Sequence, residues 1–457
     1  MKKDSDLVQR KQAAHISIKE GASSSVMSGL GDSYISAFMV ELTKNPLLIG
    51  LISSLPGLLS PIAQIYGSRL MEKHPRKKIV SRSALIHGLM WIPIAAIALL
   101  FYLNILTPKL PYFLLIAYTS LAILGAIGGP AWFSWMGDIV HEKERGKYFG
   151  KRNRIIGFCS LSVFFLASFL LDFFKTKGMV MIAFMIMFLV ASGFRVFSYT
   201  LFKKKYEPEL KLTKDYYFSF WQYITRYGNF LKFSIYQSAF YFSLMISSPF
   251  FTYYMLDHLK FSYLSFTLVS ISSTLFYLMT LPIAGKFSDK YGNIKMLYVS
   301  SLGFALYPLL WLFVSSPLGL ILLPQLVIGV STAGFTIAST NFIYDTVTPQ
   351  KRGICAAYMS VLVGLGIFVG SMTGGFILKT VNFSWIQPIF FVFIVSAILR
   401  FLVTIIFVPK IKERRQYQEK GKLFYVTQIF RLTTGEGRNL VVNMQNQFSK
   451  MIPFTRK

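Results

Sequence analysis

The sequence predicts an all-α membrane protein with twelve transmembrane helices, arranged as two six-helix bundles that are related by an internal repeat. Hydrophobic residues make up 54% of the 457 residues and charged residues only 15%, whereas soluble domains carry about 25% charged residues. Apolar stretches of about 20 residues, long enough to cross a bilayer, recur along the whole chain. The second six of these stretches repeat features of the first six, which indicates a duplicated helix set.

The apolar stretches define the expected elements in order. The first six spans cover residues 21–40, 46–67, 83–103, 110–137, 155–171 and 178–202 and form an N-terminal bundle over residues 21–202. The second six cover residues 233–256, 261–285, 296–316, 318–344, 353–378 and 380–408 and form a bundle over residues 233–408. Residues 1–20 are polar and lack the apolar stretch of a signal peptide. A basic linker, residues 203–232, joins the bundles, and residues 409–457 form a basic tail.

Positive charge is distributed unevenly between alternate loops. If residues 1–20 are cytoplasmic, 40 of the 48 Lys and Arg residues lie in cytoplasmic segments and only six in the other loops. The positive-inside rule then predicts a multi-pass protein of the cell membrane with both termini in the cytoplasm. The basic loops and tail are expected to lie against anionic lipid. This placement accounts for the net charge of +29, so no nucleic-acid partner is needed.

Three paired features suggest the repeat. The loop at residues 68–77 resembles the loop at residues 285–294 in its small, acidic and basic positions. Asp138 is followed seven residues later by Arg145, and Asp345 is followed seven residues later by Arg352. Arg195 and Arg400 stand at similar depths in the sixth and twelfth spans. One such match could arise by chance, but three in the same order suggest duplication.

These loops resemble the signature of the major facilitator superfamily, which runs Gly-x-Leu-Ala-Asp-Arg-x-Gly-Arg-Arg after the second helix. Residues 285–292 match it well. The first copy has Ser68 and Pro75 at the two Gly positions and Glu72 at the Asp position. The stretch at residues 129–153 is similar to a poorly characterised prokaryotic branch of the superfamily, which supplies no substrate. The resemblance implies the superfamily fold and transport by alternating access. A proline and glycine motif of many drug antiporters is lacking in residues 155–171, which weakens a drug-export interpretation.

Asp32 is the one acidic residue well inside an expected span. A carboxylate in the membrane costs free energy unless it faces a cavity, is paired or is protonated, so such residues mark functional sites. The resemblance implies that the first, fourth, seventh and tenth helices line a central cavity. Asp32 is therefore a candidate for binding a proton, a sodium ion or a cationic substrate. The alternative is a neutral, hydrogen-bonded Asp that packs against the small residues around it.

Charged residues at the cytoplasmic helix ends are candidates for a gate: Glu72, Arg76, Asp138, Arg145, Asp289, Asp345 and Arg352. Charges at the edge of a low-dielectric region need partners, and those partners change when two halves rock. The resemblance implies the same role. The alternative is that the basic residues only set the topology. Arg195 and Arg400 are further candidates, which either extend to the membrane surface or pair with Asp138 and Asp345.

Aromatic and amide residues of the cavity-lining helices are the remaining binding candidates: Trp132, Trp135, Tyr236, Gln237, Tyr241 and Asn341. Such a lining suits stacking on, and hydrogen bonding to, a small organic solute. The alternative is that the Tyr and Trp residues near span ends anchor the helices at the membrane interface.

The sequence therefore predicts a secondary active transporter for a small organic solute, coupled to a proton or a sodium ion. No HExxH, GxSxG or P-loop pattern occurs, so we expect no enzyme, no cofactor, no metal site and no ATP-driven pump. A transport-inactive receptor or scaffold and a lipid-handling protein are the alternatives on the same fold.

Overall fold

The computed structural model describes residues 2–141, 144–208, 219–226, 228–348 and 351–413, which contain helices and no strand. Within these residues, nine helices are long and apolar enough to cross a membrane. The first, seventh and ninth expected spans also form helices, although the first and seventh are broken and the ninth is short. The described chain therefore follows the predicted twelve-span pattern, and the all-α membrane fold is confirmed.

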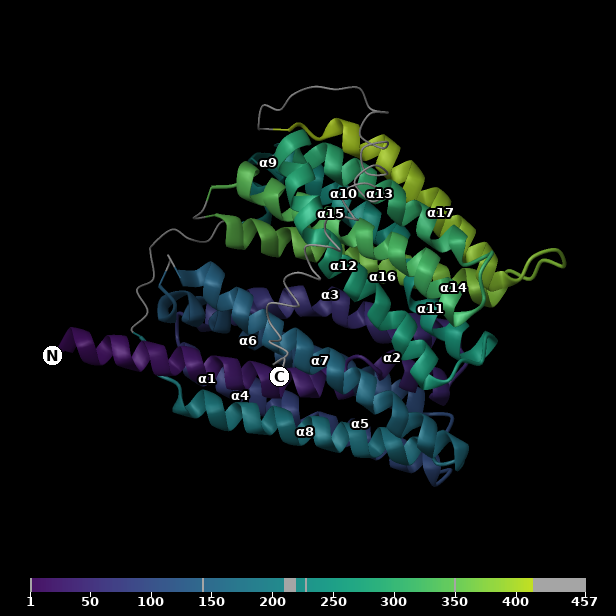
Figure 1. The fold of residues 1–457 in the computed structure, drawn as a ribbon, viewed down its shortest axis with the longest axis horizontal. Helices are drawn as coiled ribbons and strands as arrows, with labels where there is room; N and C mark the ends of the chain where they lie inside the picture. The colour runs from purple at the N-terminus through teal and green to yellow at the C-terminus, as the bar shows by residue number, and fades with distance from the viewer. Residues whose placement is uncertain (1, 142–143, 209–218, 227, 349–350, 414–457) are drawn as a thin grey trace, which may run out of the picture.

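The N-terminal half contains six spans, two of them interrupted (Figure 1). In order they are α1 (Lys2–Leu30) with α2 (Ile35–Leu42), α3 (Pro46–Leu70), α4 (Arg76–Leu89) with α5 (Trp91–Tyr102), α6 (Leu110–Ile139), α7 (Arg145–Thr176) and α8 (Val180–Lys204). Helix α3 begins at Pro46, because proline is well tolerated in the first turn of a helix. The side chain of Asn45 caps this helix by accepting a hydrogen bond from the amide of Leu47 at 3.0 Å.

The C-terminal half repeats this order after α9 (Phe220–Arg226), a short helix of the linker. Its spans are α10 (Gly228–Met245) with α11 (Ser248–Tyr253) and η2 (Tyr254–His258), α12 (Tyr263–Tyr291), α13 (Asn293–Leu310), α14 (Pro317–Leu320) with η3 (Ile321–Gln325) and α15 (Leu326–Thr346), α16 (Arg352–Thr380), and α17 (Pro388–Phe407) with η4 (Val408–Lys410). Part of the expected linker, residues 209–218 and 227, and almost all of the expected tail lie outside the described residues.

Two helices extend well beyond the apolar stretches that predicted them. Helix α1 starts at Lys2 although the span was expected from residue 21, and α7 starts at Arg145 although its span was expected from residue 155. Lys, Arg, Gln and Glu are good helix formers, so a helix can continue into a polar segment that leaves the lipid. These extensions place charged residues inside the N-terminal half.

The two halves share a core at one end of the molecule only. We call the end that carries residues 71–75 and the start of α1 the basic end, and the end that carries residues 43–45 and 259–262 the opposite end. One apolar cluster near the opposite end joins the halves, with Phe38 from α2 and Phe250 from α11. Toward the basic end each half has its own cluster, around Trp135 in the first and Phe233 in the second. In Figure 1 the two bundles diverge toward the side on which the chain begins.

Helices α3 and α16 bring the halves together through small residues. A Cβ atom at Gly364 of α16 would lie 2.7 Å from the carbonyl oxygen of Gly57 in α3, and one at Gly375 would lie 3.2 Å from Leu47. On another face of α16, Gly366, Gly370 and Gly374 pack on carbonyl oxygens of α10 and the residue that follows it. The glycines let the backbones approach closely, so α16 contacts both halves at once.

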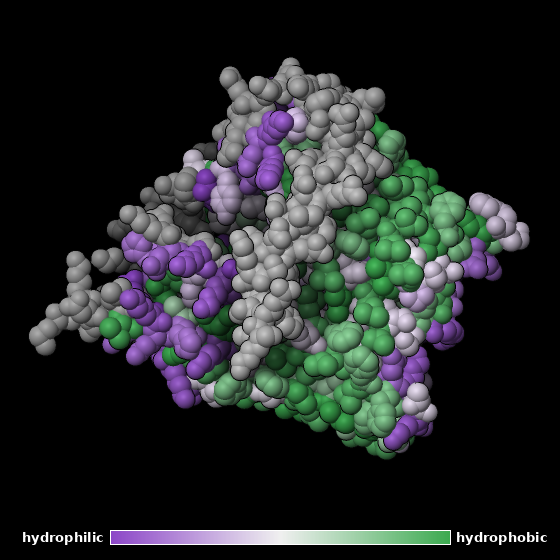
Figure 2. All heavy atoms as spheres, viewed as in Figure 1, coloured by the Kyte–Doolittle hydropathy of each residue, from purple (hydrophilic) through white to green (hydrophobic). Residues whose placement is uncertain are grey.

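The surface agrees with a membrane-embedded molecule. On the face shown in Figure 2, hydrophobic side chains cover a broad region and hydrophilic side chains gather toward the two ends. Large apolar side chains such as Phe133, Phe158 and Phe313 are at least 75% exposed. Such exposure is unfavourable in water but expected against lipid.

Candidate functional site

Asp32 lies where the first span is broken. Residues 31–34 form a turn between α1 and α2, and the amide of Ser33 bonds to the carbonyl of Ser28, five residues back, at 3.0 Å. Gly31 sits at this break against the indole of Trp91, which a Cβ atom would approach to 2.3 Å. The half-buried carboxylate of Asp32 accepts hydrogen bonds from the hydroxyls of Ser28, at 3.0 Å, and Tyr118, at 3.4 Å. The sequence candidate therefore occupies an irregular, polar point of a cavity-lining helix.

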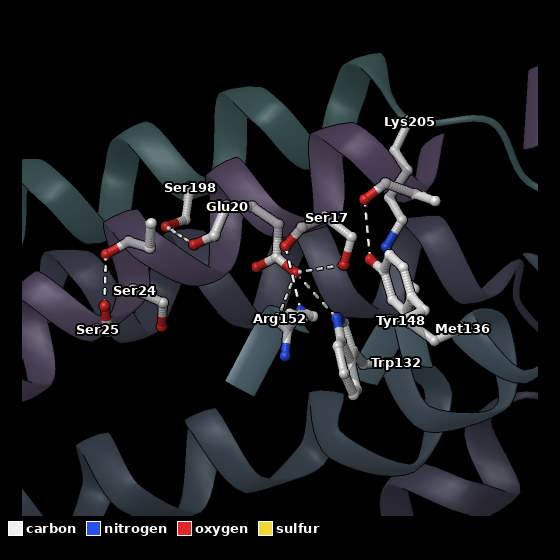
Figure 3. A network of polar contacts seen from close by, with 12 residues as sticks. Ser17, Glu20, Ser24, Ser25, Trp132, Met136, Tyr148, Arg152, Ser198 and Lys205 are labelled. Carbon is white, nitrogen blue, oxygen red and sulfur yellow. Dashed lines mark hydrogen bonds and ion pairs between the residues drawn. The ribbon is translucent and has the colours of Figure 1, made fainter. Parts of the chain in front are cut away.

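A buried ion pair lies about three turns before this break. Glu20 of α1 is 2% exposed, and Arg152 of α7 donates to its carboxylate at 3.1 Å. The same Oε1 atom accepts from the indole N–H of Trp132 at 3.1 Å and from the hydroxyl of Ser17 at 3.2 Å (Figure 3). The Arg152 guanidinium also lies over the Trp132 ring at 4.5 Å. A buried carboxylate is stable only with such partners, and here Arg152, Trp132 and Ser17 provide them.

A cavity of about 360 Å³ opens beside this ion pair within the N-terminal half. Helices α1, α4, α6, α7 and α8 surround it, and its lining includes Glu20, Ser24, Ser28, Trp132, Arg152 and Arg195. Arg195 donates to the hydroxyl of Ser24 at 2.9 Å. Asp32 is joined to this cavity through Ser28, which both lines it and donates to the carboxylate. Of the candidates that the sequence suggested, Asp32, Trp132 and Arg195 are thus brought together.

The basic end contains pairs within each half. Arg76 is fully buried and forms an ion pair with Asp138, while its Nε lies 3.6 Å from Glu207. In the second half Asn293 donates to Asp345 at 3.0 Å. Asn293 follows Arg76 by 217 residues, which is the offset of the repeated loops. The repeat therefore keeps a polar contact between corresponding helices, α4 with α6 and α13 with α15. In the second half, the amide of Asn293 replaces the guanidinium of Arg76.

The other gate candidates are placed differently. Glu72 and Asp289 are exposed, and the side chain of Arg145 lies outside the described part of the structure. Arg352 donates to the carbonyls of Tyr344 and Val347, at 2.8 and 3.0 Å, at the end of the preceding helix. Their role in a gate that changes partners stays a prediction.

Arg400 follows neither interpretation that the sequence left open. It is 1% exposed, so it does not extend to the surface, and its hydrogen bonds go to the carbonyls of Phe304 and Leu244 and to the hydroxyl of Ser247 at 2.6–3.0 Å. The carbonyl of Leu244, at the break between α10 and α11, also accepts from the amide of Ser247 at 3.3 Å and the hydroxyl of Ser248 at 3.0 Å, so the guanidinium is one of three donors that hold this break. Arg195 likewise bonds to Ser24 in place of Asp138.

Several aromatic candidates are core residues in this state. Trp135 is fully buried and donates to the carbonyl of Tyr206 at 2.9 Å. Tyr236 is fully buried with its hydroxyl 2.6 Å from that of Ser301, and Gln237 donates to Ser339 at 2.8 Å. Tyr241 and Asn341 are half-buried. Trp135 and Tyr236 are therefore not interfacial anchors, and a role of either residue in binding stays a prediction.

Polar contacts between the halves lie at the opposite end, where the sequence predicted none. Asp172 of α7 accepts from the amides of Tyr263 and Leu264, the first two residues of α12, at 2.7 and 2.9 Å. The hydroxyl of Tyr263 donates to Glu41 at 2.6 Å, and Lys44 lies 2.7 Å from Asp257. We call these residues the opposite-end latch. The sequence signal for this latch was an acidic residue just after the end of an expected span, as at Glu41, Asp172 and Asp257. This signal does not identify the partner in the other half.

Comparison with known sequences matches this two-half arrangement. The profile of the Major Facilitator Superfamily matches residues 21–236 and again residues 233–442. The chain is 30% identical over 149 residues to Multidrug resistance protein 2 of Bacillus subtilis, covering 32% of this chain and 36% of that protein. It is 27% identical over 147 residues to Vacuolar basic amino acid transporter 2 of Saccharomyces cerevisiae, covering 31% and 30%. These alignments span about a third of the length of each relative.

Solved structures share the fold at low sequence identity. The nucleoside transporter NupG superposes with a TM-score of 0.61 at 15% identity, covering 88% of this chain and 99% of that chain. A bacterial homolog of the human lysosomal transporter Spinster, inward-facing and unoccupied, gives 0.62 at 13% identity, with 89% and 99% covered. The xylose transporter XylE of E. coli, partially occluded and inward open, gives 0.59 at 13% identity, with 91% and 100% covered.

Proposed function

The chain belongs to the major facilitator superfamily, and we propose that it is a secondary active transporter which moves a small organic solute by alternating access, with Asp32 as the site of a coupling proton. Membership makes it a multi-pass membrane transporter that binds a small molecule. Secondary active coupling, the organic nature of the solute and the role of Asp32 are the proposal. The relatives transport, by their names, drugs, basic amino acids, nucleosides and xylose, so they do not select one solute.

The observation that carries the proposal is the difference between the two ends of the molecule. The halves share one apolar core and the opposite-end latch, but have separate cores toward the basic end. We infer that a solute enters between the halves from the basic end in this state. Transport follows if the halves rock so that the latch parts and the basic end closes, as in other duplicated transporters.

The positive-inside rule supports an orientation for this state. The basic end carries the start of α1, the loop at residues 71–75 and the ends of α8 and α17, which are rich in Lys and Arg. We therefore propose that it faces the cytoplasm of a cell membrane, that both termini are cytoplasmic, and that the structure is an inward-facing state. The basic linker and tail then lie at the leaflet that carries anionic lipid.

Asp32 is suited to binding and releasing a proton. Its hydrogen-bond partners, Ser28 and Tyr118, are hydroxyl groups, which can donate to a carboxylate or accept from a carboxylic acid. Both protonation states therefore keep hydrogen bonds. The break at residues 31–34 gives the site a backbone that can move between two arrangements, because it is not held by a regular helix ladder.

Transport in proteoliposomes tests the proposal. The purified chain is reconstituted with a pH gradient, and proton flux is recorded while amino acids, nucleosides, sugars, monocarboxylates and cationic dyes are added in turn. We expect one solute class to move protons and to accumulate. Asp32→Asn should abolish accumulation while downhill exchange persists. Glu144→Gln, which changes an exposed acidic residue just before α7, should keep both.

Three outcomes would contradict the proposal. Binding of a solute without flux would indicate a receptor or scaffold. Lipid movement that is independent of the pH gradient would indicate a lipid-handling protein. Accumulation by Asp32→Asn with unchanged rate and pH dependence would remove Asp32 from coupling, even if transport itself is observed.

A further inference from the structure

The cavity in the N-terminal half carries an unbalanced positive charge when Asp32 is protonated. Three charged residues line it: Glu20, Arg152 and Arg195. Glu20 and Arg152 neutralise each other as an ion pair at 3.1 Å. Arg195 forms no ion pair with any carboxylate among the described residues. The carboxylate of Asp32, which is joined to the cavity through Ser28, also faces Arg195. When Asp32 holds the proton proposed above, one cation in the cavity is unmatched, and a low-dielectric region then favours an anion of a single charge.

Arg195 has unused hydrogen-bonding capacity. A guanidinium carries five N–H donors. Among the described residues, Arg195 makes one hydrogen bond, from Nη1 to the hydroxyl of Ser24. Its Nε is buried and has no acceptor within the described structure. A buried donor without a partner costs about 1–3 kcal/mol, so an acceptor that enters the cavity would recover part of this free energy. The Ser24 hydroxyl, which accepts from Arg195, still has its own proton to donate.

The repeat-related arginine shows what a structural arginine looks like in this fold. Arg400 stands at a similar depth in the twelfth span, but it makes three hydrogen bonds, to the carbonyls of Phe304 and Leu244 and to Ser247. No cavity is needed to explain its position. Arg195 has the same place in the repeat, fewer protein partners and a cavity beside it. The difference between the halves therefore points to a ligand at Arg195.

The remaining lining defines the rest of the ligand. Val80, Ile156 and Phe202 provide apolar contacts. The volume of about 360 Å³ is at the lower end of the roughly 300–1,000 Å³ of small-molecule sites. A solute with a carboxylate at one end and a short aliphatic or aromatic body fits this combination of size, charge and apolar wall.

We propose that this cavity binds a small organic monocarboxylate, whose carboxylate accepts hydrogen bonds from the Arg195 guanidinium and the Ser24 hydroxyl while its apolar body contacts Val80, Ile156 and Phe202. Arginine is suited to this role because its planar donors match the two oxygens of a carboxylate. The inference rests on the proposed function, of which it names the substrate class, and it places the binding site inside the first half.

Binding to the purified full-length chain tests this site without any flux. Thermal unfolding is followed at constant pH with acetate, butyrate, hexanoate, benzoate and 3-phenylpropionate, each beside its neutral amide. Because a ligand that binds the folded state raises its stability, we expect at least one carboxylate, and not its amide, to raise the unfolding temperature. Isothermal titration then gives the dissociation constant.

Two variants and one matched control locate the site. Arg195→Gln should weaken carboxylate binding about 10- to 100-fold, the loss of a hydrogen bond to a charged group, and should remove the preference over the amide. Gly129→Leu should block the cavity, because Gly129 lines it and a Cβ atom there has open space. Gly193→Leu is the control, since Gly193 also faces open space but does not line the cavity.

The outcomes separate this inference from the proposed function. If none of the five carboxylates is preferred over its amide, or if Arg195→Gln and Gly129→Leu bind the carboxylate as the unmodified chain does, the site is refuted, whatever the chain transports. If carboxylate binding depends on Arg195 and no solute is transported, the site stands and the proposed function fails.

Discussion

Replacing Asp172 with Ala is expected to release the opposite-end latch. The Asp172 carboxylate accepts from the amides of Tyr263 and Leu264, which are first-turn donors of α12 without partners inside the helix. Because Asp172 belongs to the first half and α12 to the second, these hydrogen bonds exist only while the halves meet at this end. Their loss therefore destabilises the present state relative to a state that is open at the opposite end.

The magnitude follows from capping energies. Removing a capping side chain costs about 0.5–2 kcal/mol, and a carboxylate at a helix N-terminus contributes about 0.3–1 kcal/mol through the helix dipole. The Ser262 hydroxyl still accepts from the amide of Ser265, so α12 keeps one cap. We therefore expect a shift of about 1–2 kcal/mol, which changes the ratio of the two states by a factor of about 5–30.

Distances between spin labels at the opposite end measure this shift. Lys109→Cys in the first half and Ser315→Cys in the second carry the labels on exposed positions, and both native cysteines are replaced. Asp172→Ala should enlarge the population with the longer distance. Asp257→Ala is the matched control, because its partner Lys44 is 70% exposed and such pairs contribute about 0–1 kcal/mol. An unchanged distribution in Asp172→Ala, or a larger change in the control, would refute the reasoning.

Three further predictions concern stability in detergent. Gly31→Ala should lower the free energy of unfolding by about 1–3 kcal/mol, because the Cβ atom would overlap the Trp91 ring. Gly157→Ala is the control, since Gly157 faces open space; equal melting temperatures of the two variants would contradict this. Arg400→Gln should cost at least about 2 kcal/mol, since the carbonyl of Phe304 loses its guanidinium donor; an unchanged unfolding curve would contradict this. Burial lowers the pKa of Lys205, beyond the end of α8, to about 8, below roughly 10.4 in an unfolded chain. The unfolded state then binds more protons between these values, so stability should rise with pH across this window, by on the order of 3 kcal/mol; Lys205→Met should flatten the profile.

Hydropathy predicted the helices because each apolar stretch reports on its contact with lipid, but it could not predict where the polar extensions end. Glu20 and Arg152 were expected in cytoplasmic segments, since the apolar stretches begin after them. Helices α1 and α7 continue through both residues, so their charges meet inside the half. The two residues are 132 positions apart in sequence, and no local pattern indicates such a pairing.

The sequence also did not show which face of each helix is buried. Asp32 was predicted because a carboxylate among small residues is conspicuous within an apolar span. Trp135 and Tyr236 were candidates because their helices line a cavity in the resembling family, yet both side chains point into the core of their own half. Most faces of a transmembrane helix are apolar, toward lipid as well as toward protein, so periodicity does not distinguish the buried face.

Helix α16 has a consequence for how the halves can move. Some of its contacts with α3 are made by glycines against backbone atoms, as at Gly364 and Gly375, so the two backbones lie close together there. Tilting one half against the other at these glycine contacts requires little change of side-chain rotamers. The activation barrier between the two states then resides mainly in the contacts that must break, at Asp172 and Glu41, and the exchange rate becomes adjustable by substitutions far from the solute.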